Sequence, residues 1–219
     1  MKKIAVLSFA ALAFSGLASA SITPSLDSGF PTFISAAVGF QYRYTIAVDA
    51  LEQLNPVATS TKPCTPAAPC GTFFTIYDIA GLLGTNGGGA PPQPQVPTVP
   101  AGWSYSIQLL GATANPQTTV PDSASIANVS YIYNGATQVG PFSLGGFSYY
   151  SSIGTTTQNG FFSYQASRQD ALGNVQANTP DTGQGGVTVP LAGVPEPGSM
   201  LLIGGGLVGL ALLRRKLVR

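Results

Sequence analysis

The stretch QYRYTIAVD, residues 41–49, decides the fold class of this chain. Its aromatic and aliphatic side chains recur at every second position, and polar side chains fall on the opposite face. The first set is Tyr42, Tyr44, Ile46 and Val48, and the second is Gln41, Arg43, Thr45 and Asp49. Successive side chains of a strand point to opposite faces, so this period of two predicts a half-buried β-strand.

Other segments share this strand character. Phe73–Ile79 is apolar on both faces, which suits the centre of a sheet, and Ile126–Tyr133 runs into Asn134 and Gly135, the strongest short hairpin signal in the chain. The remaining predicted strands are Trp103–Leu109, Phe142–Tyr150, Phe161–Ala166 and Val187–Val189. No internal stretch shows clean helical periodicity. We therefore expect an all-β fold, a single β-sandwich with jelly-roll or Greek-key-like connections.

Two long interruptions separate these strands. Leu54–Gly71 holds both cysteines, and Gly84–Pro100 is rich in glycine and proline. We interpret the second as an extended, mobile excursion of polyproline type. Asn178–Gly193 is also rich in turn residues, and we expect a flexible stalk there.

The N-terminus has the three parts of a secretory signal. Lys2 and Lys3 precede the apolar run Ile4–Leu17, and Ala18, Ser19 and Ala20 follow it. Small residues then occupy both positions that a signal peptidase inspects. The sequence predicts cleavage by signal peptidase between Ala20 and Ser21.

The C-terminal region contains a short candidate membrane segment. Gly198–Leu213 is sixteen uncharged residues, with Glu196 before it and Arg214, Arg215 and Lys216 after it. As a helix it would reach about 24 Å, against a hydrocarbon core of about 30 Å, so local thinning or snorkelling arginines must cover the difference. We expect a single transmembrane helix over 198–213 with its basic end in the cytoplasm.

These C-terminal features resemble a known routing device. Val194, Pro195, Glu196 and Pro197, then the apolar segment, then the terminal basic cluster, are similar to the PEP-CTERM sorting signal of Gram-negative bacteria. The resemblance covers only about the last 26 residues. It implies that exosortase, a membrane-embedded cysteine protease, recognises Pro195, Glu196 and Pro197 and removes the tail. Arg214 and Arg215 would act as the retention signal.

The expected organisation follows from these segments. It comprises a signal peptide at 1–20, an exported β-sandwich domain at 21–177, a stalk at 178–193 and the sorting signal at 194–219. The domain would be held at the inner membrane on its periplasmic side, and it would reach the cell surface or the exterior after the tail is cut.

The charge of the exported part excludes one class of partner. Six of the nine cations lie in the terminal segments, so Ser21–Val194 has three cations against seven acidic residues, a net charge of −4. Nucleic-acid binding needs clustered cations, so we expect no nucleic-acid partner. The acidic residues are Asp27, Asp49, Glu52, Asp78, Asp122, Asp170 and Asp181.

Cys64 and Cys70 are the only cysteines and belong to the exported part. An oxidising compartment favours a disulfide between them, which would staple the loop and contribute about 2 kcal/mol. A redox or metal pair is the alternative, but the chain has no histidine and the spacing is not CxxC.

Catalytic constellations are scarce in this sequence. The absence of histidine excludes Ser-His-Asp and Cys-His arrangements. The carboxylates are scattered singly, and we interpret them as turn-forming and solubilising residues rather than as a glycosidase pair. We expect no cofactor and no metal, with a calcium site built on Asp170, Asn174 and Asp181 as an open alternative. Trp103 and the tyrosines suit a core better than a sugar-binding platform.

The function expected from these observations is that of a non-enzymatic envelope or extracellular-matrix protein. The resemblance associates it with biofilm and exopolysaccharide. A carbohydrate-binding module is the first alternative, and a glycan-active enzyme is the second.

Overall fold

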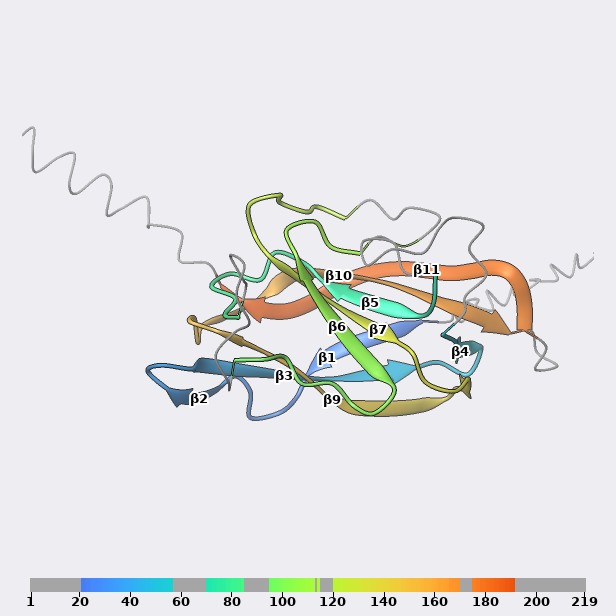
Figure 1. Cartoon of the computed structure of the whole chain (residues 1–219), viewed down its shortest axis with the longest axis horizontal. Helices are drawn as coiled ribbons and strands as arrows, with labels where there is room; N and C mark the ends of the chain where they lie inside the picture. Colours follow the sequence, from blue (N-terminus) through green and yellow to red (C-terminus); the bar gives the residue numbers. More distant parts are fainter. Residues whose placement is uncertain are drawn as a thin grey trace, which may run out of the picture.

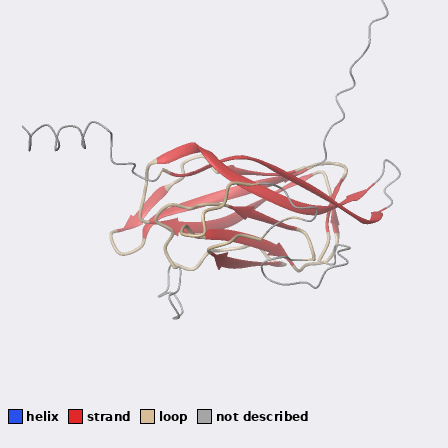
Figure 2. Cartoon of the chain, turned by 90° about the horizontal axis from the view of Figure 1, so that it is seen from above, coloured by secondary structure: helices blue, strands red, loops and turns tan. Residues whose placement is uncertain are grey.

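The computed structural model describes residues 21–56, 70–84, 95–112, 114, 120–169 and 175–191. Within these ranges the chain forms strands and loops without a helix, as Figure 2 shows. Two antiparallel sheets face each other (Figure 1). The expected all-β class and the β-sandwich architecture are confirmed.

The first sheet is centred on the strand that contains the alternating residues 41–48. Its strands are β1 (Ile22–Leu26), β2 (Thr32–Ser35), β3 (Gly39–Val48) and β9 (Phe142–Ser151). The predicted alternation holds, because Tyr42, Tyr44, Ile46 and Val48 are all buried. β9 pairs along one edge of β3, so β1 and β2 share the other edge, β1 beside residues 44–48 and β2 beside residues 39–41.

The second sheet contains β4 (Glu52–Leu54), β5 (Phe73–Ile76), β6 (Trp103–Gln108), β7 (Asn128–Tyr133), β8 (Gln138–Val139), β10 (Thr156–Gln169) and β11 (Val175–Pro190). The order is β6-β7-β5-β10-β4-β8. β5 and β4 pair with successive parts of one edge of β10, and β11 pairs along its other edge. β5 lies between β7 and β10 and is buried on both faces, which confirms its predicted central place.

The hairpin predicted at Asn134 and Gly135 is wrong. β7 is paired on both edges, by β5 and by β6, so it has no edge left for the next strand. β8 pairs instead with β4. The N–H of Asn134 donates to the carbonyl of Gly102 at 2.7 Å, which ties the turn to the start of β6 rather than to a hairpin partner.

Aromatic rings join the two sheets. Phe147 of the first sheet lies edge-on to Phe74 and Trp103 of the second, with centroid distances of 5.1 and 4.9 Å. Such pairs contribute about 0.5–1.5 kcal/mol each beyond the area they bury. Tyr44 and Tyr149 share a hydrogen bond of 2.7 Å between their hydroxyls, and Tyr44 also donates to the carbonyl of Thr188. These two hydroxyls are therefore satisfied within the core, whereas the buried hydroxyl of Tyr131 has no hydrogen-bond partner among the described residues.

The stalk predicted for residues 178–193 is wrong as far as Pro190. This segment belongs to β11, and Val187 and Val189 are buried in the core, which confirms the short strand predicted there. The glycines of this segment suggested a flexible stalk, but two of them are strand residues that face aromatic rings. Gly183 and Gly185 stand opposite Tyr164 and Phe162, whose rings fill the space that a side chain would take.

Candidate functional site

The residues of the predicted sorting signal lie outside the described residues. This holds for Pro195, Glu196, Pro197, Arg214 and Arg215, and also for the signal peptide at 1–20. Among the residues that are described, no helix is both long and apolar enough to cross a membrane. The predicted transmembrane helix at 198–213 is not among them.

Ser21 and Ile22, the first two described residues, are part of the folded domain. Ser21 accepts the N–H of Asp49 at its carbonyl and donates its hydroxyl to Asp49 Oδ2 at 2.8 Å. Ile22 begins β1 and is fully buried. The sandwich thus extends to the residue that signal peptidase would leave at the N-terminus.

Cys70 lies at the entry to β5 and is 9% exposed, whereas Cys64 is outside the described residues. The part of the chain that is described contains no free cysteine. The Cys64–Cys70 disulfide stays a prediction.

Two of the acidic residues have structural roles on the first sheet and its turns. Asp27 accepts hydrogen bonds from Arg43 Nε and Thr45 Oγ1, both at 2.7 Å. The Arg43 guanidinium also lies 5.2 Å from the centroid of the Phe30 ring. Asp49 is bonded to Ser21 as described above. These contacts agree with the expectation that such carboxylates hold turns.

A second group of polar side chains ties together three loops beside the second sheet. Asp122 accepts from Asn128 Nδ2 at 2.9 Å and from the N–H of Gly111 at 3.0 Å. Asn128 Oδ1 accepts the N–H of Asp78, and Asp78 in turn accepts the N–H of Ser123. Asn128 is fully buried, so the Asn-Val-Ser sequon that it begins offers no accessible side chain. Every member of this group is engaged in holding loops.

Glu52 is the acidic residue whose position sequence reasoning missed. It lies on β4, directly opposite Arg168 of β10, and its side chain is fully buried beside the core. Neither carboxyl oxygen makes a hydrogen bond to a described protein group. The only sequence signal is that Glu52 shares a strand face with Leu54, which also is fully buried.

The surroundings of Glu52 favour its protonated form. Burial in the low-dielectric interior, reinforced by the adjacent Asp181 carboxylate, raises the pKa of Glu52 to about 10. Arg168 opposes this shift only weakly. Tyr164 donates its hydroxyl to Asp181 Oδ2 at 3.3 Å. At neutral pH the buried Glu52 carboxyl is therefore in its neutral form, beside Asp181.

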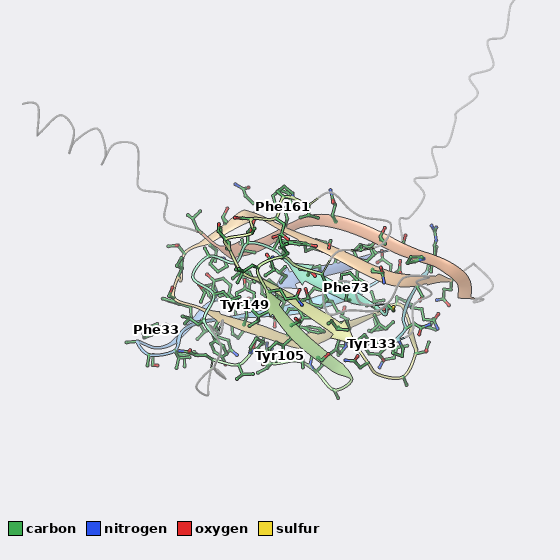
Figure 3. The ribbon with its side chains drawn as sticks, turned by 45° about the horizontal axis from the view of Figure 1, so that its top comes forward. Phe33, Phe73, Tyr105, Tyr133, Tyr149 and Phe161 are labelled. Carbon is green, nitrogen blue, oxygen red and sulfur yellow. The ribbon has the colours of Figure 1, made fainter. Side chains whose placement is uncertain are left out.

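The aromatic residues that we expected in the core rather than in a sugar-binding platform are buried there. Trp103 is 7% exposed and packs against Phe74, Tyr133 and Phe147. Figure 3 shows Tyr133 and Tyr149 within the body of the domain. The preference for the core over a platform is confirmed for these residues.

The described residues contain no group of three or more acidic or thiol side chains placed to hold a metal ion. Of the calcium alternative, only Asp181 is described. Asp170 and Asn174 lie outside the described residues.

Comparison with known proteins supports the routing motif. Residues 193–216 match the PEP-CTERM protein-sorting motif, which confirms the resemblance at the C-terminal tag. This motif implies an exported protein that is anchored in the membrane and then cleaved by exosortase. No curated protein matches the chain.

Among solved structures, the chain is similar to the collagen-binding subdomain ACE19 of the Enterococcus faecalis surface protein ACE. The identity is 11% and the TM-score is 0.29, and the match covers 78% of this chain and 96% of that one.

Proposed function

We propose that this chain is a non-enzymatic envelope or extracellular-matrix protein whose β-sandwich exosortase delivers to the cell surface. The observation that carries the proposal is the sorting motif at residues 193–216, which starts directly after a folded domain ending at Pro190. Signal peptidase acts first, the segment 198–213 then holds the domain at the inner membrane, and exosortase releases it. Biofilm exopolysaccharide is the proposed surrounding of the released domain.

The contacts of the acidic residues support a structural rather than a catalytic role for the domain. Asp27, Asp49, Asp78 and Asp122 each bind a backbone or side-chain group that holds a turn or loop. The whole chain also lacks histidine, the commonest general base. A polar, weakly charged surface suits a matrix protein that contacts hydrated polysaccharide.

Deletion of residues 194–219 tests the proposal. In a host that carries the matching exosortase, the full chain should appear at the surface with Ser21 at its N-terminus and without its tail, as intact mass will show. The truncated chain should be released into the periplasm without passing through a membrane-bound form. Equal distribution of both chains would contradict the proposed route. Specific binding in a glycan array would favour the carbohydrate-binding alternative, and turnover of a glycan would contradict the non-enzymatic assignment.

A further inference from the structure

One end of the sandwich combines exposed apolar side chains with the point where the sorting motif begins. Phe33 and Ile34 on β2 are 58% and 46% exposed, and Leu191, just after β11, is 44% exposed. In Figure 1, β2 and the final part of β11 lie at the same end of the domain, and Figure 3 shows Phe33 at that extremity.

A chain of contacts connects these residues. The N–H of Leu191 donates to the carbonyl of Thr155 at 2.8 Å. The neighbouring Gly154 lies against the Phe40 ring, and Phe40 packs on Phe33 with ring centroids 5.2 Å apart. The three exposed side chains therefore belong to one end of the domain, which we call the apolar end.

The segments that build the apolar end are free of charge. Residues 28–42, 147–156 and 187–191 contain no Asp, Glu, Lys or Arg, and the charges that border the first segment, Asp27 and Arg43, are paired with each other. The opposite end differs, because Asp49, Glu52 and Arg168 are found there. Contact with an apolar medium would cost the first end no buried charge.

The length of the connection decides which end faces the membrane. Six residues separate Leu191 from Gly198, the start of the proposed membrane segment, so the seven Cα–Cα steps between them span at most about 25 Å even when fully extended. β10 contains 14 residues, and Thr156 at its start pairs with Pro190. At about 3.3 Å per residue its far end is about 46 Å away, beyond the reach of the connection. The apolar end is thus the part of the domain held near the bilayer.

We propose that the apolar end rests on the lipid interface of the inner membrane while the precursor is anchored, with Phe33, Ile34 and Leu191 in contact with lipid. The inference rests on the proposed function, because it requires the anchored stage. Phe33 and Ile34 lie at an irregularity in the pairing of β2 with β3, and both side chains are exposed. A fluid lipid interface can accommodate both side chains whatever their directions, and the short connection to the proposed membrane segment keeps this end close to it. Since the tether keeps the domain at high local concentration, a modest apolar contact suffices.

Tryptophan quenching by brominated lipids tests the contact. The exported chain, residues 21–219, is reconstituted in vesicles of phosphatidylethanolamine and phosphatidylglycerol with and without brominated acyl chains. The only native tryptophan, Trp103, is buried and supplies a constant background. F33W and L191W should be quenched several-fold more strongly than V139W. Val139 is a matched control, since it is 53% exposed and lies on β8, which pairs with β4 at the far end.

Each outcome of this experiment supports or overturns the proposal. Flotation of the protein with the vesicles and selective quenching of F33W and L191W support it. Flotation with equal quenching of all three variants overturns the lipid contact and leaves the proposed function intact. If the F33W fluorescence changes with the density of protein in the vesicles and is not quenched by brominated lipids, the apolar end contacts a second copy of the chain. That result overturns the lipid contact. If the protein does not float with the vesicles, the C-terminal segment does not anchor it, and the proposed function is wrong as well.

Discussion

Tyr164 on β10 lies directly opposite Gly183 on β11, and a Cβ on Gly183 would approach the Tyr164 ring to 2.5 Å. The tyrosine is 4% exposed, so its ring cannot swing into solvent. The pairing explains why a strand rich in glycine is nonetheless stable: the ring of one strand occupies the space that the other leaves free.

Gly183→Ala should therefore destabilise the domain. We expect a loss of about 1–3 kcal/mol, the usual cost of overfilling a packed site. Gly186→Ala is the matched control on the same strand, because the nearest atom to its added Cβ lies at 3.6 Å, and its effect should stay within about 0.5 kcal/mol. Urea unfolding of both variants measures the difference, and equal stabilities would contradict the packing argument.

Glu52→Gln should stabilise the domain at neutral pH. The pKa of Glu52 is raised from 4.5 to about 10 in the folded state, so folding must retain a proton that the unfolded chain releases. Stability from this group is full below pH 4.5 and falls as the pH rises toward 10. An amide needs no proton, and its N–H can still face Asp181. We expect a gain of about 1–3 kcal/mol at pH 7.

The pH profile of unfolding distinguishes this cause from a packing effect. The wild-type domain should lose stability between pH 5 and pH 8, and E52Q should flatten that slope. Asp49→Asn serves as the control, since Asp49 is exposed and its contact with Ser21 lies at the surface. A parallel shift of E52Q at every pH would show that the gain does not come from the buried proton.

If Cys64 and Cys70 form a disulfide, neither residue should react with a thiol reagent in the native, exported protein. Labelling with a thiol reagent should modify neither cysteine before reduction and both cysteines after it. Replacement of both cysteines by serine should cost about 2 kcal/mol in the chain-entropy description. Modification of both thiols without reductant would refute the pairing.

Glu196→Ala should block maturation. Pro195 and Pro197 favour an extended backbone around Glu196, which would present one charge at the membrane surface. We expect the uncut, membrane-retained precursor to accumulate, as fractionation and immunoblotting would show. Val194→Ala, just outside the tripeptide, should be processed normally. Normal processing of E196A would mean that the prolines merely end the folded domain.

Local pattern was enough to predict β3 and the central strand β5. An alternating or wholly apolar segment has few other ways to bury its side chains, so the strand and its buried face follow from the residues themselves. The sorting motif at the C-terminus was equally accessible, because proteases and membranes recognise short linear segments. Both kinds of information reside in neighbours along the chain.

The tertiary structure alone decided the features that depend on distant partners. Asn134 and Gly135 carry a strong turn signal, but β5 and β6 already occupy both edges of β7. The sequence around Glu52 does not distinguish it from an exposed acidic residue. The pairing of β4 with β10 buries its carboxyl at the end of the core. Pairing between segments far apart in sequence determines which edges are free and which side chains lose water, and no local pattern encodes that choice.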